Sequence, residues 1–146
     1  MRVVSVIAIL CGLWGPAHAF ELVSRQEMKA SLAATEPLRA KAGITPGAPV
    51  IEVVSPKLSA PISSPSTIEL LFQPAANTAV RPETFKAQYG RLRIDITQRL
   101  LNATKVTAQG ITVKDASLPK GSHRLLLSIE DSEGRQGQKI IEFEVN

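Results

Sequence analysis

Cysteine, tryptophan and histidine are nearly absent from this chain. It has one cysteine, Cys11, one tryptophan, Trp14, and two histidines, and of these four residues only His123 lies beyond residue 19. A disulfide needs two cysteines, and a structural zinc site needs three or four Cys, His or carboxylate ligands at fixed spacings. We therefore expect the part of the chain after residue 19 to be stabilised by its core alone.

Motifs of the common catalytic classes are missing as well. No nucleophile elbow accompanies His123, which a Ser-His-Asp triad would require, and there is no glycine-rich nucleotide loop. Glu130, Asp131 and Glu133 lie together, but a turn explains them more simply than a calcium site. The sequence therefore predicts a protein that is not an enzyme and has no cofactor.

The one long apolar run lies at the N-terminus. Arg2 precedes the apolar residues 3–15, Pro16 ends the run, and residues 17–19 read Ala-His-Ala, a small-x-small cleavage site. The run is shorter than the about 20 residues that span a bilayer. We expect residues 1–19 to be a secretory signal peptide cleaved near Ala19. The mature protein would then be periplasmic or secreted, without a membrane span.

Basic residues are concentrated in the middle of the chain. The net charge is +4, and the stretch from residue 81 to residue 105 holds more of the excess than the rest. Such a surface attracts acidic partners, although a solvated strand face is the alternative. Modest charge and export both disfavour nucleic acid, so we expect another periplasmic or envelope protein as the partner. The predicted partner-binding basic face comprises Arg81, Lys86, Arg91, Arg93 and Arg99.

Residues 20–48 differ from the rest of the mature chain. Ser24 and Glu27 form a capping-box pattern, which predicts the start of a helix. The apolar stripe of that helix, Met28 and Leu32, is narrow. We expect residues 20–48 to be a spacer, partly helical or disordered and mobile rather than packed. The alternative is a helix that docks on a partner.

From residue 49 onward, hydrophobic residues alternate with polar ones, which is the period of a strand with one buried face. Residues 131–134 predict a hairpin turn between the last two strands. Residues 82–89 fit a strand or a helix, and their surroundings favour a strand. Residues 98–103 are compatible with a helix. The alternation recurs around residues 51–54, 67–72, 91–96, 111–113, 125–129 and 141–145.

About seven short strands with turn signals between them predict an all-β fold, an Ig-like antiparallel β-sandwich over residues 49–146. Residues 80–86, 118–125 and 143–145 resemble bacterial Ig-like modules of exported proteins. The resemblance implies a seven-stranded sandwich that serves as a spacer or an adhesive module and has no catalytic activity.

The same order of segments, with residues 66–72 near the front, also resembles the periplasmic copper-resistance C family. That family binds Cu(II) through an N-terminal histidine and an Asp-x-His element in the last hairpin. Cleavage after Ala17 would make His18 the N-terminal residue of this chain. In the last hairpin, Arg135 stands after Gly134, where the histidine should be, and a guanidinium has no lone pair for a metal.

The candidate metal ligands that remain are His18, His123 and Asp131. Our leading interpretation is an exported, non-enzymatic Ig-like module that acts through protein–protein contacts or as a structural spacer. The first alternative is a periplasmic metal-binding protein or copper carrier that uses these residues. The second is a module that binds a polysaccharide or a small ligand.

Overall fold

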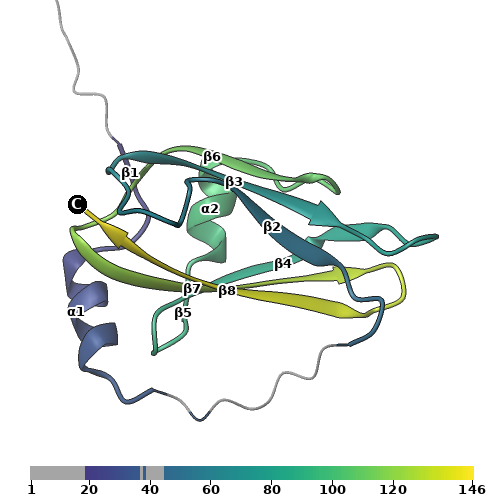
Figure 1. The fold of residues 1–146 in the computed structure, drawn as a ribbon, viewed down its shortest axis with the longest axis horizontal. Helices are drawn as coiled ribbons and strands as arrows, with labels where there is room; N and C mark the ends of the chain where they lie inside the picture. The colour runs from purple at the N-terminus through teal and green to yellow at the C-terminus, as the bar shows by residue number, and fades with distance from the viewer. Residues whose placement is uncertain (1–18, 37, 39–44) are drawn as a thin grey trace, which may run out of the picture.

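Two four-stranded sheets face each other in the structure, a computed structural model that describes residues 19–36, 38 and 45–146. The upper and lower layers of Figure 1 are these two sheets. The predicted signal peptide up to His18, and residues 37 and 39–44 of the predicted spacer, lie outside the described residues. Among the described residues, no helix has both the length and the apolar character needed to cross a membrane.

The first sheet has the strand order β1-β6-β3-β2 and the second has the order β5-β4-β7-β8. All pairs within the sheets are antiparallel except β1 with β6, which is parallel. The all-β sandwich predicted from the alternation is therefore confirmed. The strands are β1 (Phe20–Glu21), β2 (Val50–Ser55), β3 (Ser66–Gln73), β4 (Val80–Tyr89), β5 (Ile94–Asp95), β6 (Gly110–Ser117), β7 (Gly121–Asp131) and β8 (Gln136–Val145), and the helices are α1 (Arg25–Ala33) and α2 (Thr97–Ala103).

The core lies between the sheets and is built from alternate residues of their strands. Burial of each such side chain contributes about 1.5–3 kcal/mol. The helix α2 closes one side of the sandwich between β4 and β6, with Leu100 buried. Its first residue is tied to β4 because the Ala87 amide donates to the Thr97 hydroxyl at 3.0 Å. The most regular inward-facing runs are Ile68, Leu70 and Phe72 of β3 and Leu125, Leu127 and Ile129 of β7.

Three local predictions are confirmed. Residues 82–89 are a strand within β4, and residues 98–103 lie in α2. Residues 131–134 form the turn between β7 and β8, where the Asp131 amide donates to the Arg135 carbonyl at 3.1 Å. Gly134 has φ +76° there, a left-handed conformation that glycine adopts without strain.

The strand expected over residues 91–96 is wrong for its first half. Only Ile94–Asp95 forms a strand, and the chain turns between Gly90 and Arg93, where the Arg93 amide donates to the Gly90 carbonyl at 3.3 Å. Both residues have positive φ, +66° and +51°. Because the chain turns here, these residues cannot continue an extended strand. Leu92 is therefore 51% exposed, although the alternation places it on the buried face.

The expectation of a mobile helix after residue 20 is also wrong, because that segment packs on the sandwich. Leu22 and Val23 are fully buried, and Met28 packs against the core. The helix α1 begins as the capping box predicts: the Glu27 amide donates to the Ser24 hydroxyl at 3.2 Å, and the Ser24 amide donates to the Glu27 carboxylate at 2.9 Å. Residues 20–36, called the arm below, therefore belong to the folded domain.

Candidate functional site

The sandwich makes a series of side-chain hydrogen bonds with its own arm. Three arginines from different elements contact it: Arg99 from α2, Arg91 from the turn after β4, and Arg124 from β7. In Figure 1, α1 lies beside the end of the sandwich where β7 begins. Two of these arginines belong to the predicted partner-binding basic face, and Arg124 does not.

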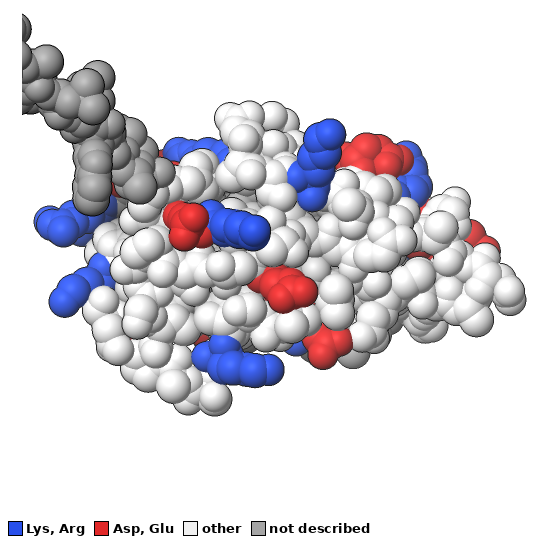
Figure 2. Space-filling view, turned by 90° about the horizontal axis from the view of Figure 1, so that it is seen from above, with Lys and Arg blue, Asp and Glu red and all other residues white. Residues whose placement is uncertain are grey.

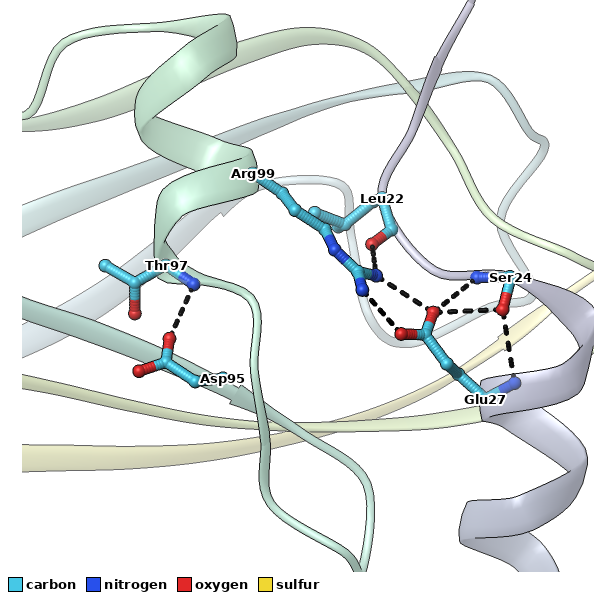
Figure 3. Close-up of polar contacts among 6 residues, drawn as sticks. All are labelled: Leu22, Ser24, Glu27, Asp95, Thr97 and Arg99. Atoms are coloured by element: carbon cyan, nitrogen blue, oxygen red, sulfur yellow. Dashed lines mark hydrogen bonds and ion pairs between the residues drawn. The ribbon is translucent and has the colours of Figure 1, made fainter.

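Arg99 binds the first turn of α1. Its guanidinium donates to both carboxylate oxygens of Glu27, at 2.9 and 2.5 Å, and to the Leu22 carbonyl at 3.1 Å (Figure 3). The hydrogen bonds from Arg99, aided by those from Ser24, lower the pKa of Glu27 to about 2. Planar guanidinium–carboxylate pairing of this kind fixes the direction of both side chains. The start of α1 is thus held in place by one residue of α2.

The middle of α1 lies directly on the turn after β4. The Arg91 amide donates to the hydroxyl of Ser31 at 2.8 Å, and Ser31 is only 4% exposed. A Cβ atom on Gly90 would come within 1.8 Å of the same hydroxyl oxygen. Only a glycine with its positive φ admits the helix at this distance.

The C-terminal end of α1 is bound by two further arginines. The Arg91 guanidinium donates to the carbonyls of Leu32 and Ala34 at 3.2 Å each. These carbonyls lie at the negative end of the helix dipole, where a cation is favourable. Arg124 donates to the Glu36 carboxylate at 2.5 Å and forms an ion pair with Glu142 at 3.5 Å. Arginines of the sandwich therefore bind the arm at both ends of α1.

A groove of about 420 Å³ lies next to the C-terminal half of α1. Its floor contains three rings: His123 stacks on Phe143 with ring centroids 5.5 Å apart, and the Tyr89 ring is tilted against His123 with centroids 5.8 Å apart. Its walls carry carboxylates and arginines. The lining residues with polar side chains include Ser31, Glu36, Arg91, Ser122, Arg124 and Glu142.

His123, a candidate metal ligand from the sequence, is buried within β7. It is 3% exposed, and both ring nitrogens are engaged: Nε2 lies 2.7 Å from the Pro119 carbonyl and Nδ1 lies 2.9 Å from the Tyr89 hydroxyl. Because a carbonyl only accepts, Nε2 carries the proton and the Tyr89 hydroxyl donates to Nδ1. Burial lowers the pKa of His123 and raises the pKa of Tyr89 to about 12.

Asp131, the other predicted metal ligand within the described residues, holds the last hairpin together. It is fully buried, and its carboxylate accepts from the amides of Glu133 and Arg135 at 2.9 Å each and from the Arg135 Nε at 2.8 Å. Burial works to raise the pKa of this carboxyl, but the hydrogen bonds and charge of Arg135 outweigh it, so the pKa is lowered. Arg135, which replaces the histidine of the copper-resistance pattern, is thus the partner of Asp131.

The structure does not bring the candidate metal ligands together. Asp131 and His123 lie toward opposite ends of β7, about 26 Å apart at about 3.3 Å per residue of strand. His18 lies outside the described residues. Within the described ranges, no three His, Cys, Asp or Glu side chains are grouped so that they could hold a metal ion.

The five residues of the predicted basic face are spread over several elements. Arg81 and Lys86 belong to β4, Arg91 and Arg93 to the turn after it, and Arg99 to α2. Arg81 pairs with Glu83 at 3.0 Å. Figure 2, seen from above the β3–β6 side, shows basic and acidic groups interspersed among uncharged ones on this face, with no continuous basic patch. Instead, the structure brings Arg91, Arg99 and Arg124 together on the arm, which all three contact.

The edges of the sheets are poorly suited to pairing with a foreign strand. Two edge strands, β1 and β5, are two residues long, and β2 has a bulge between Val53 and Ser55. The fourth edge strand, β8, carries Lys139 on the same face as the buried Gly137 and Ile141, yet Lys139 is exposed. Short edges, bulges and inward-phase lysines all oppose strand addition. A binding surface that accepts a helix fits this molecule better than one that accepts a strand.

Comparisons with protein-family models, with curated proteins and with solved structures give no match for this chain. The resemblances to bacterial Ig-like modules and to the copper-resistance C family therefore stay predictions from the sequence.

Proposed function

We propose that the chain is an exported, non-enzymatic β-sandwich module that binds a protein partner in the periplasm or outside the cell. One observation carries this proposal: the sandwich has a surface that binds a helix. Arg91, Arg99 and Arg124 come from three elements and meet the carboxylates and terminal carbonyls of α1. Helix-in-groove binding with arginine–carboxylate pairs is a common mode of protein recognition.

Export is supported by the position of the predicted cleavage site relative to the fold. Cleavage after Ala19 would release the chain at Phe20, the first residue of β1, which pairs with Ala116. The fully buried Leu22 and Val23 follow at once. A cut at this bond therefore removes the predicted signal peptide and leaves the buried core whole.

The engagement of His123 supports a role without catalysis. A general base needs a free nitrogen that can reach a substrate proton. In this chain, the Pro119 carbonyl and the Tyr89 hydroxyl use both ring nitrogens, and the ring is stacked on Phe143. Its geometry is that of a structural residue in the floor of the groove.

The test has two steps in a bacterial host that expresses the full chain with a C-terminal tag. Fractionation and N-terminal sequencing should find a periplasmic or secreted protein that begins at Phe20. A photo-crosslinking amino acid is then placed at Ser122, which is exposed on β7 and borders the groove, or at Leu71, which is 39% exposed on β3.

We expect one dominant protein adduct from position 122, weakened by Arg124→Ala and absent from position 71. Equal adducts from both positions, no adduct at all, or a cytoplasmic protein with its first 19 residues intact would reject the proposal. The Leu71 variant is the matched control because it carries the same crosslinker at an exposed position of the other sheet.

A further inference from the structure

We propose that the surface under α1 is a receptor for an acidic amphipathic helix of a partner protein, and that α1 is a competitor bound in cis which this helix displaces. The receptor site consists of Gly90, Arg91, Arg99, Arg124 and the groove over Phe143. The inference rests on the proposed function, because it names the chemistry of the partner that the module would bind.

The contacts that hold α1 are mostly polar and partly exposed. Ser31 is its one buried residue, Leu32 is 48% exposed, and only Met28 packs against the core. In the Arg99–Glu27 pair the side chains are 39% and 22% exposed. Ion pairs in contact with water contribute little, and a helix of 9 residues is marginal on its own. A minor population with α1 undocked follows from these contacts.

Undocking of α1 does not require the core to open. Leu22 and Val23, which are fully buried, anchor the chain just before the capping residue Ser24. The chain can therefore turn at Ser24 while the anchor stays in the core. Apart from the core contact of Met28, the surface that α1 leaves is made mainly of Gly90 and arginines, which water solvates readily.

The helix α1 does not fill its own site. Beside it remains the groove of about 420 Å³ with the Tyr89, His123 and Phe143 rings in its floor. This volume lies within the roughly 300–1,000 Å³ of ordinary ligand pockets. A helix with a large apolar side chain over Phe143 would bury surface that α1 leaves exposed, and would bind more tightly.

The contacts of α1 specify what such a helix must carry. It needs a carboxylate near its start for Arg99, as Glu27 provides, and another beyond its end for Arg124, as Glu36 provides. It needs a small residue against Gly90, where Ser31 lies. The fourth requirement is the large apolar side chain that Leu32 provides only in part.

The experiment uses the mature chain from Phe20 and a fluorescein-labelled synthetic peptide of residues 24–36, with binding followed by fluorescence anisotropy. The double variant Glu27→Gln/Glu36→Gln weakens α1 in cis and leaves the receptor arginines intact. While α1 is docked, the site is closed to the peptide, so the apparent affinity for the peptide is the intrinsic affinity multiplied by the fraction of molecules with α1 undocked. We therefore expect the double variant to bind the peptide about tenfold more tightly than the wild type.

Two comparisons make the test specific. A peptide that carries Leu32→Trp should bind the double variant more tightly than the unmodified peptide, because the larger ring fills the groove. Adding Arg124→Ala to the double variant should weaken binding at least about fivefold, whereas Arg81→Ala should leave it unchanged, because Arg81 pairs with Glu83 on β4.

Three results would overturn this inference. If the wild type and the double variant bind the peptide with equal affinity, α1 is not a displaceable cis helix. The same conclusion follows if the peptide does not bind a double variant whose α1 amides exchange rapidly with deuterium. Continued protection of those amides in the double variant would exclude it too. If crosslinking at position 122 still captures a partner in that case, the proposed function stands and only the acidic helix is rejected.

Discussion

Arg99 of α2 and Glu27 of α1 form a two-point ion pair between segments that lie 72 residues apart in the chain, with donor–acceptor distances of 2.5 and 2.9 Å. Glu27 also accepts from the amide and hydroxyl of Ser24 and so completes the cap of its own helix. One carboxylate therefore stabilises α1 locally and attaches it to the sandwich. Because Glu27 makes both kinds of contact as a carboxylate, the docking of α1 depends on pH.

We predict that α1 undocks in acid. The folded state lowers the pKa of Glu27 to about 2 from an ordinary value of 4.5, so the stabilisation is complete above pH 4.5 and is lost as the pH falls from 4.5 toward 2. The protection factor of the α1 amides in deuterium exchange, which is the intrinsic rate divided by the observed rate, should fall across this window in the wild type. In Glu27→Gln the protection factor should already be low at neutral pH and change little with pH.

The associated change in the free energy of unfolding is small. Because Arg99 is more than a third exposed, we expect Glu27→Gln to cost about 1 kcal/mol or less at pH 7, and less again in 1 M salt, where surface charges are screened. A loss in Glu27→Gln that does not depend on salt would contradict the ion-pair explanation and point to the cap alone.

Gly90→Ala should release α1 because the new methyl group would lie 1.8 Å from the Ser31 hydroxyl. The matched control is Gly134→Ala: Gly134 also has a left-handed φ, +76° against +66°, but no atom lies within 4 Å of a Cβ built there. Both variants should lose about 1–2 kcal/mol from backbone strain. Only Gly90→Ala should lose protection of the α1 amides, and equal exchange in the two variants would contradict the contact.

Much of this fold can be predicted from the sequence, since the alternation of strands and the capping box at Ser24 are local patterns. The burial of His123 was also readable, because it shares the phase of the buried Leu125 and Leu127. The receptor site was not predictable, since it depends on pairs such as Arg91 with Ser31, which are 60 residues apart. The concentration of basic residues between residues 81 and 105 predicted two of the three arginines, Arg91 and Arg99, but not the helix that they bind.

His123 should make stability fall below neutral pH. Burial lowers its pKa in the folded state below the ordinary 6.5, so the unfolded chain takes up the proton first. Stability is therefore complete above pH 6.5 and declines as the pH drops below it, until the folded state is protonated as well. The groups around the ring are Tyr89, the Pro119 carbonyl and Glu144, and the charge of Glu144 opposes part of the shift.

Urea unfolding between pH 7.5 and pH 5 tests this expectation. The double variant Tyr89→Phe/His123→Phe replaces both members of the Tyr–His hydrogen bond by apolar rings and should remove the decline in this range. Tyr89→Phe alone keeps the imidazole and should keep the decline. If the double variant shows the same slope as the wild type, another group titrates and the assignment to His123 is wrong.

Leu22 anchors the arm in the core. Its side chain is fully buried and lines a small apolar cavity of the core with Leu70 and Leu127, while its carbonyl accepts from Arg99. Leu22→Ala should lower the free energy of unfolding by about 2–5 kcal/mol, the usual loss for a truncated core leucine. Leu38→Ala is the control: Leu38 follows the arm but is 97% exposed, so its truncation should change stability by less than about 0.5 kcal/mol. If both variants unfold at the same urea concentration, the arm is not anchored in the core, and a chain that starts beyond Val23 would fold equally well.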